Sequence, residues 1–260
     1  MSKLQEIFEH KKTEIEFAKS RISIQELQSI ALDQEAPRDF LGAIKNASGL
    51  ALIAEVKKAS PSEGTIRADL DPADVAKKYE RVGATCLSVL TDERYFQGCA
   101  ENLRIAKRTV SIPCLRKDFM CDPYQIYEAR AWGADAILLI ASYLEITEIE
   151  DLQALANSLG MAALVEVHNE TELENAILAK SSLTGVNNRD LKQFTTDVVV
   201  SERLIPLIKQ AGALAVSESG LRSKEDLDRM RDAGADAVLI GTTFCKSPDI
   251  EGKVREVMGW

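Results

Sequence analysis

The sequence has 260 residues, 45% of them hydrophobic, and its 32 Lys and Arg against 41 Asp and Glu give a formal net charge of −9. Such an acidic chain repels nucleic acid and anionic membranes, and its longest apolar run, 136–141, is far too short to span a bilayer. Because charged residues also interrupt the N-terminal stretch where a signal peptide needs an apolar core, we expect a cytoplasmic protein, acting as a monomer, that binds neither nucleic acid nor membrane.

Two helices are expected before the first strand. Residues 3–19 set apolar side chains among many charges with a loose helical spacing, and a second short helix is predicted near 38–45. These segments form an N-terminal helical extension over 1–48, and the remainder, 49–260, contains repeated units. Because no low-complexity stretch or long linker separates the two parts, we predict a single domain over 1–260.

In the repeated units, a glycine precedes a short apolar run. A helix is predicted to start at Asp71-Pro72, with Asp as cap and Pro in the first helical position, and to stop at Gly83, which opens the run GATCLSVLT. A glycine in that place suits the left-handed residue that closes a helix just before a strand. The same phrase returns after Gly133, Gly160, Gly212 and Gly234. Further helix starts are predicted at Asp122-Pro123 and at the box-like pairs Thr147 with Glu150, Asn169 with Glu172, and Ser223 with Asp226.

Strand and helix alternate through the chain. Strands are predicted near 51–57, 85–91, 113–119, 136–141, 162–167, 183–188, 214–219 and 237–242. Eight βα units in about 200 residues favour the α/β class and a closed (β/α)8 TIM barrel. A doubly wound open sheet is the alternative. It is disfavoured because the first strand is not followed by a G-x-G-x-x-G turn and because polar residues gather at the C-terminal ends of the strands.

Charged side chains end several strands that are otherwise apolar. Successive side chains of a strand alternate between its faces, so Glu55 and Lys57 share one face of the strand predicted at 51–57. In the strand predicted at 113–119, Lys117 shares a face with apolar residues. Surface salt bridges or structural ion pairs are the plain alternatives. A lone carboxylate such as Glu166 inside an apolar run is rarely there for packing. Lys117 is a candidate acid or Schiff-base nucleophile, because low-dielectric surroundings would lower its pKa.

The other strand ends offer polar groups suited to an anionic ligand. Asn187 and Arg189 project the same way and supply an amide and a planar fork suited to a carboxylate, although an Asn-Asn turn is the plain alternative. Small residues end the seventh and eighth strands, where barrels commonly hold phosphate. These residues, Ser219, Gly220, Gly241 and Thr242, together with Ser60, predict a cradle for a phosphorylated small molecule.

The cysteines indicate neither a disulfide framework nor a metal site. They are odd in number, form no C-x-x-C pair, and are accompanied by only His10 and His168. We expect reduced thiols, with Cys86 and Cys114 as small core residues, and no bound metal. The other cysteines are Cys99, Cys121 and Cys245.

Seven motifs run in order along nearly the whole chain: AEVKKASPSEG, SVLTDERYFQG (88–98), LRKDFMCDPYQI (115–126), LVEVH (164–168), GVNNRDL (185–191), SESGL (217–221) and LIGT (239–242). In this combination the chain resembles the indole-3-glycerol phosphate synthase family of tryptophan biosynthesis. The resemblance implies a (β/α)8 barrel with an N-terminal helical extension. It also implies a carboxy-lyase that needs no cofactor and converts 1-(2-carboxyphenylamino)-1-deoxyribulose 5-phosphate to indole-3-glycerol phosphate.

The resemblance also implies roles for individual residues. Lys117 looks like the general acid that protonates the substrate ketone, with Glu55 and Lys57 close to it, and Glu166 like the group that manages a later proton transfer. Asn187 and Arg189 resemble substrate-orienting groups, and the phosphate would be surrounded by Ser60, Ser219, Gly220, Gly241 and Thr242. The aromatic ring would be walled by Leu90, Phe96, Phe119 and Leu138, and Leu239 of the LIGT motif would also contact substrate.

Two features depart from the family pattern. Glu63 stands where relatives often have Lys or Arg, which removes one attraction for phosphate, and 179–184 is poorer in apolar residues than a sixth barrel strand usually is. Two other functions remain open on the residues alone. A Schiff-base aldolase would use the same lysine, carboxylates and phosphate cradle, whereas a non-catalytic sensor of phosphorylated metabolites would need only the cradle.

Overall fold

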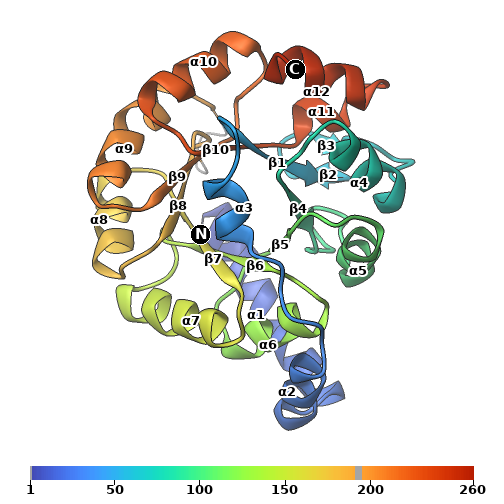
Figure 1. The fold of residues 1–260 in the computed structure, drawn as a ribbon. Coiled ribbons are helices and arrows are strands. Elements are labelled where there is room, and N and C mark those ends of the chain that lie inside the picture. Colours follow the sequence, from blue (N-terminus) through green and yellow to red (C-terminus); the bar gives the residue numbers. More distant parts are fainter. Residues whose placement is uncertain (1, 191–194) are drawn as a thin grey trace.

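The computed structural model describes residues 2–190 and 195–260, and in it a ring of strands is enclosed by helices (Figure 1). Within these residues eight parallel strands pair as β1-β4-β5-β6-β7-β8-β9-β10, and β10 pairs with β1, for example Ala237 with Ala51. The predicted (β/α)8 barrel is confirmed, and the open sheet is wrong because no strand is left at an edge of this sheet. The strands are β1 (Ala51–Val56), β4 (Cys86–Leu90), β5 (Cys114–Lys117), β6 (Ala136–Ile140), β7 (Ala162–Val167), β8 (Leu183–Asn187), β9 (Leu214–Glu218) and β10 (Ala237–Ile240).

The sixth predicted strand is present although it is poor in apolar residues. It is β8, which begins at Leu183 and pairs with both neighbours. The buried Ser181 hydroxyl, just before the strand, donates to the carbonyl of Leu183 at 3.0 Å, so this polar side chain is satisfied where the strand begins.

Helices connect the strands and form the outer ring of the barrel (Figure 1). The predicted caps Asp71, Asp122, Asn169 and Ser223 all accept hydrogen bonds from the first turns of their helices. The predicted start at Thr147 is wrong, because the helix begins earlier, at Ile146. The helices are α4 (Pro72–Arg81), α5 (Ala100–Thr109), α6 (Pro123–Ala131), α7 (Ile146–Ser158), α8 (Glu170–Leu178), α9 (Val199–Gln210), α10 (Lys224–Ala233), α11 (Thr242–Cys245) and α12 (Ile250–Met258).

The helix α7 begins earlier than predicted for a local reason. The Glu148 carboxylate accepts a hydrogen bond from the backbone N–H of Glu145 at 2.8 Å, so Glu148 takes the place in the first turn that the sequence assigned to Glu150. The glycines that open the repeated phrase behave as predicted. Gly83, Gly133, Gly160, Gly212 and Gly234 have φ between 77° and 91°, the left-handed region that turns the chain from helix to strand.

Three helices precede the barrel: α1 (Lys3–Arg21), α2 (Ile24–Leu32) and α3 (Phe40–Lys45). The first and third match the prediction, whereas α2 was missed because it is short and buries only Leu27 and Ala31. In Figure 1, α3 lies in front of the ring and α1 lies behind it. Phe40 of α3 packs with residues at the starts of strands, such as Ala51, so α1 and α3 cover opposite ends of the barrel.

The helix α1 is attached to the barrel by a buried ammonium group. Lys11 is 4% exposed, and its Nζ lies 2.9 Å from Asp92 Oδ2 and 3.0 Å from Asp118 Oδ1. The ring of Phe8 also stacks on Tyr143, with ring centroids 3.5 Å apart. Because Asp118 directly follows Lys117, this attachment fixes α1 beside the charged end of β5.

The core follows the expectation for the cysteines. Cys86 and Cys114 are fully buried, and burial raises the pKa of each thiol, so both behave as small apolar residues. All five cysteines are free. Among the described helices, none combines the length and apolar character needed to cross a membrane.

Candidate active site

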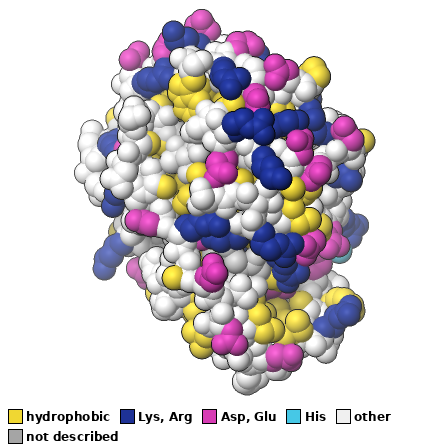
Figure 2. Space-filling view, turned by 45° about the vertical axis from the view of Figure 1, so that its right-hand side comes forward, with side chains coloured by type: hydrophobic (Ala, Val, Ile, Leu, Met, Phe, Trp, Pro, Cys, Tyr) yellow, Lys and Arg dark blue, Asp and Glu magenta, His cyan; other side chains and the backbone are white. Residues whose placement is uncertain are grey.

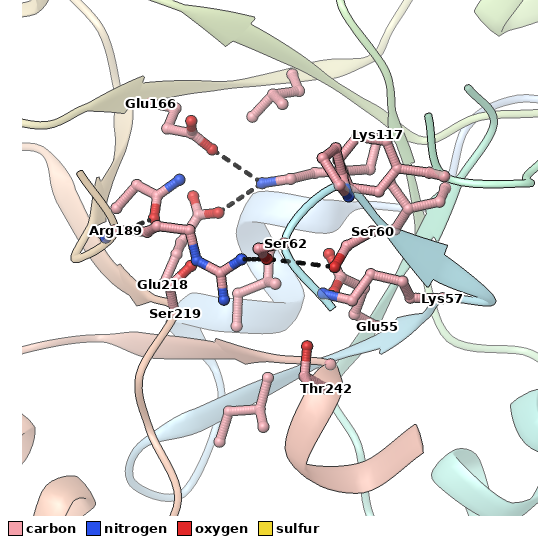
Figure 3. Close-up of a pocket in the computed structure, with 18 of the residues that line it drawn as sticks. Glu55, Lys57, Ser60, Ser62, Lys117, Glu166, Arg189, Glu218, Ser219 and Thr242 are labelled. Atoms are coloured by element: carbon pink, nitrogen blue, oxygen red, sulfur yellow. Dashed lines mark hydrogen bonds and ion pairs between the residues drawn. The ribbon is translucent and has the colours of Figure 1, made fainter. Parts of the chain in front are cut away.

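A cavity opens at the carboxyl ends of the strands, and every predicted site residue lines it (Figure 3). The cluster forms because parallel strands of a barrel all end at the same rim, so side chains far apart in sequence converge there. The lining residues that were predicted are Glu55, Lys57, Ser60, Leu90, Phe96, Lys117, Phe119, Leu138, Glu166, Asn187, Arg189, Ser219, Gly220, Leu239, Gly241 and Thr242. Leu191, the last residue of the GVNNRDL motif, lies outside the described residues.

Lys117 is the centre of the charged part of the cavity. Its ammonium Nζ lies 2.5 Å from Glu218 Oε2 and 3.1 Å from Glu166 Oε2, so it bridges carboxylates from β9 and β7 (Figure 3). A second pair stands on β1 and just after it, where Lys57 Nζ lies 2.5 Å from Glu55 Oε2. The structure thus brings together the four residues predicted to be catalytic, and it adds a fifth charged group, Glu218.

The pairing keeps opposite charges in place despite burial. Burial alone would lower the pKa of Lys117, but Glu218, Glu166 and Glu55 together raise it well above its usual range. Burial would likewise raise the pKa of Glu166, but Lys117 and His168 lower it to about 2. At neutral pH the site therefore contains an ammonium ion and an ionised Glu166.

The pKa of Glu218 is shifted in the opposite direction to that of Glu166. Burial and the nearby Glu166 charge raise its pKa to about 7, although Lys117 opposes the shift. The direction agrees with the contacts, because Glu218 Oε1 has no hydrogen-bond partner among the described residues, whereas Glu166 also meets Asn187 and His168. One carboxylate is thus held ionised and the other is close to gaining a proton, an arrangement suited to proton transfer.

Glu218 is a charged lining residue that the sequence analysis did not predict. It lies in a stretch of small residues, 217–220, that was interpreted only as a phosphate-binding turn. The available signal was its phase, because Glu218 shares a strand face with Val216, which is a core residue inside the barrel. On β8 Glu218 is paired with Asn187, and its carboxylate lies over Gly185, where a Cβ would collide with it. Gly185 is therefore the residue that makes space for this acid.

Gly241 has a comparable role on the opposite side. It was predicted to surround phosphate, and a Cβ at this position would collide with the carboxylate of Glu55. The residue therefore gives Glu55 its place in the cavity, and it also opens α11, whose first residue is Thr242. Ser219 and Gly220 have φ of 64° and 80°, two successive left-handed residues in the turn after β9. Such a turn can direct backbone N–H groups toward an anion.

Arg189 reaches across the cavity to the loop after β1 (Figure 3). Its guanidinium donates to the hydroxyl of Ser62, and its backbone N–H donates to Asn187 Oδ1 at 3.1 Å. The buried Nε of Arg189 has no hydrogen-bond partner among the residues that the structure describes. The loop itself folds back as a short ribbon, β2 (Ala59–Ser60) with β3 (Gly64–Thr65), and Glu63 at its tip pairs with Lys246 at 2.5 Å.

Apolar side chains form one wall of the cavity. Phe96 and Phe119 lie with ring centroids 5.9 Å apart, next to the other predicted wall residues. Leu4 and Ile7 of α1 complete the wall, and sequence reasoning missed them because α1 lies outside the repeated units. In residues 2–190 and 195–260 no group of three or more His, Cys, Asp and Glu side chains is placed to hold a metal ion.

These features define the class of protein. A (β/α)8 barrel that buries acids and ammonium groups beside an apolar wall, at the carboxyl ends of its strands, has the architecture of an enzyme that works by general acid and base catalysis.

The comparisons with known proteins name the family. Residues 4–257 match the family described as indole-3-glycerol phosphate synthase. The chain is 45% identical, over 98% of both chains, to the indole-3-glycerol phosphate synthase of Azoarcus sp. (strain BH72) and likewise to that of Neisseria meningitidis serogroup B. It is 47% identical to that of Acidithiobacillus ferrooxidans over 94% of both chains.

The chain belongs to the indole-3-glycerol phosphate synthase family. It is a carboxy-lyase of tryptophan biosynthesis that acts on a phosphorylated small molecule. The aldolase and sensor alternatives are set aside by this result. The part that each residue plays in the reaction stays a prediction.

Proposed function

We propose that Lys117 is the general acid of the indole-3-glycerol phosphate synthase reaction. The substrate is 1-(2-carboxyphenylamino)-1-deoxyribulose 5-phosphate, and its aromatic ring carbon attacks the ketone carbon. As that C–C bond forms, the ketone oxygen receives a proton from the ammonium group, and CO2 then leaves and restores the aromatic ring. The observation that carries this assignment is the buried ammonium between Glu166 and Glu218, because it keeps a charged proton donor in a partly dry cavity.

The carboxylates then serve the loss of water. Glu166 is ionised, so it acts as the base that takes a substrate proton while the new hydroxyl leaves with a proton from an acid in the site. Glu218, whose pKa is about 7, returns a proton to Lys117 across their 2.5 Å contact. The Glu55–Lys57 pair stands beside them and keeps the local charge balanced. The products are indole-3-glycerol phosphate, CO2 and water.

The remaining residues hold the substrate in place. The guanidinium of Arg189 and the amide of Asn187 bind the benzoate carboxylate, which must be oriented before it is lost. The phosphate lies on the turn of Ser219 and Gly220 and near the start of α11, with hydroxyls from Ser60 and Thr242. The benzoate ring packs against the apolar wall, to which Leu90, Phe96, Phe119, Leu138 and Leu239 contribute with Leu4 and Ile7 of α1.

We propose that the protein is a cytoplasmic monomer. The predicted site residues, from β1 to the start of α11, meet in one cavity, and the net charge is −9. On the face in Figure 2, acidic side chains lie among the basic ones, which does not favour binding of nucleic acid.

Borohydride added during turnover tests the role of Lys117. A general acid forms no bond to substrate, so the protein should stay active and intact mass measurement should show no added mass. If Lys117 instead formed an imine with the ketone, reduction would leave a substrate-sized adduct that peptide mapping finds on this residue. Such an adduct would overturn the general-acid assignment.

Replacing Arg189 with lysine should lower kcat/KM by roughly tenfold to a hundredfold, equivalent to about 1.4–3 kcal/mol. Lysine keeps the charge but loses the planar fork that matches a carboxylate. Steady-state kinetics of R189K measures the effect, and R203K is a suitable control because Arg203 is an exposed residue of α9 that pairs with Glu170. Unchanged kinetics of R189K would make Arg189 a bystander.

A further inference from the structure

His168 stands directly behind Glu166 and is not needed by the chemistry described above. Its Nδ1 lies 2.9 Å from Glu172 Oε2, and its Nε2 lies 3.5 Å from Glu166 Oε1. The other oxygen of Glu166 faces Lys117 at 3.1 Å. Glu172, His168, Glu166 and Lys117 therefore form a continuous row from α8 into the active site, and the His168 side chain is 12% exposed.

The partners of Glu172 fix the tautomer of His168. The Glu172 carboxylate accepts a hydrogen bond from the backbone N–H of His168 at 2.7 Å and another from the Asn169 side chain at 2.7 Å. An ionised carboxylate can only accept hydrogen bonds, so the imidazole must carry its proton on Nδ1 and donate it to Glu172. A neutral imidazole would then present a bare lone pair at Nε2.

That lone pair would face the carboxylate of Glu166. Nε2 of His168 is buried and has no hydrogen-bond partner among the described residues, and the nearest acid is Glu166. Two lone pairs in this position repel each other, so one proton must lie between the two groups, either on His168 or on Glu166. Burial would lower the pKa of His168, but Glu172 and Glu166 raise it, while Lys117 favours the ionised form of Glu166. The proton therefore belongs to the imidazole.

We propose that His168, as an imidazolium, is a positioning residue that holds Glu166 ionised and oriented for its proton transfer. The inference rests on the role proposed above for Glu166 as a base. Two cations then hold the carboxylate, with Lys117 at one oxygen and His168 at the other, and only the side toward the cavity is open to a substrate proton. When His168 loses its proton to solvent, one oxygen of Glu166 loses its cationic partner, and the carboxylate is no longer held in the orientation that its role as a base requires.

Several charged groups act on this histidine. Glu166 and Glu172 face it directly, and Glu218 of β9 adds a more distant negative charge. Lys117 of β5 and the amide of Asn187 on β8 act on it through Glu166. A group whose pKa is raised stays protonated to higher pH, so the activity that depends on the imidazolium is present below that pKa and is lost as the pH rises through it.

Two substitutions of His168 distinguish the role of Nδ1 from the role of Nε2. Asparagine at 168 places an amide near Nδ1 and nothing near Nε2, whereas glutamine places an amide near Nε2 and can donate an uncharged hydrogen bond to Glu166. We expect H168N to lower kcat about tenfold with KM within about twofold, and H168Q to recover part of that loss. The alkaline fall of the wild-type kcat should be reduced in both variants, because neither amide side chain titrates.

The variant E172Q tests the same row without changing the histidine. Loss of the Glu172 charge lowers the pKa of His168, so the alkaline fall of kcat should move to lower pH. An unchanged alkaline fall in H168N and H168Q would overturn the proposal and assign that titration to Glu218. Failure of the base assignment itself is recognised separately: an E166Q variant that keeps wild-type kcat would remove Glu166 as the base, whatever the histidine variants do.

Discussion

Replacing Lys117 with methionine should lower kcat by about a thousandfold or more, which corresponds to about 4 kcal/mol of transition-state stabilisation. Methionine fills much of the same space but has no proton to give to the ketone oxygen and no charge to balance Glu166 and Glu218. Substrate binding should survive, because the turn at Ser219 and Gly220 and the start of α11 are unchanged.

The turnover rate is measured from the fluorescence of the indole product. Substrate binding is measured by calorimetry with K117M, which should be too slow to consume the substrate. K78M is the matched control, because Lys78 lies on α4 and pairs with Asp74 far from the cavity. A K117M enzyme with kcat close to wild type would exclude Lys117 as the acid. Equal loss of binding and turnover would instead show that Lys117 mainly holds substrate.

Replacing Lys11 with methionine should lower the free energy of unfolding by about 3–5 kcal/mol, because it removes one partner of a buried ionic cluster. Asp92 is fully buried and Asp118 is 3% exposed, and Lys11 neutralises both. Arg116 still pairs with Asp118 at 3.1 Å, whereas Asp92 keeps only backbone donors such as the N–H of Tyr95 at 2.7 Å. The change should also raise KM, because α1 contributes Leu4 and Ile7 to the cavity.

Urea denaturation at neutral pH measures the loss of unfolding free energy, and K12M is the control because Lys12 is exposed and pairs with the exposed Glu9. The pH dependence has a definite sign. Burial would raise the pKa of Asp118, but Lys11 and Arg116 hold it well below its usual range. A depressed carboxyl pKa contributes stability above the unfolded value of about 3.9 and loses it in acid. The difference between K11M and wild type should therefore narrow as the pH falls below about 5. A constant difference would contradict this role of Lys11.

The barrel and most of its cavity could be predicted because they depend on local patterns. Each strand is a short apolar run, and each strand end is recognised by a change to polar residues, so Lys117 and Glu166 could be found one strand at a time. The approach of Lys117 to Glu218 could not be found in this way. It depends on the closure of the barrel, which brings β5 and β9 to the same cavity, and on Gly185 of β8, which leaves space for the Glu218 carboxylate.

The position of α1 beside the cavity could not be predicted for a similar reason. The apolar residues of α1 have a helical spacing, but nothing in that spacing tells which end of the barrel the helix covers. Its place is decided by Lys11 meeting two acids that lie at 92 and 118 in the sequence. Charge pairing between distant segments requires the folded arrangement and has no counterpart in a local pattern.

The pairing of β1 with β10 also determines the order in which the enzyme can be completed during synthesis. β1 is made early, and β4 can join it soon afterwards, but its other edge has no partner until residues 237–240 leave the ribosome. Until then an apolar strand carrying Glu55 presents unpaired backbone groups, the kind of edge that attracts other chains. The nascent protein therefore depends on β10 for protection against aggregation, and the strand that carries Glu55 is enclosed only after residues 237–240 have been made.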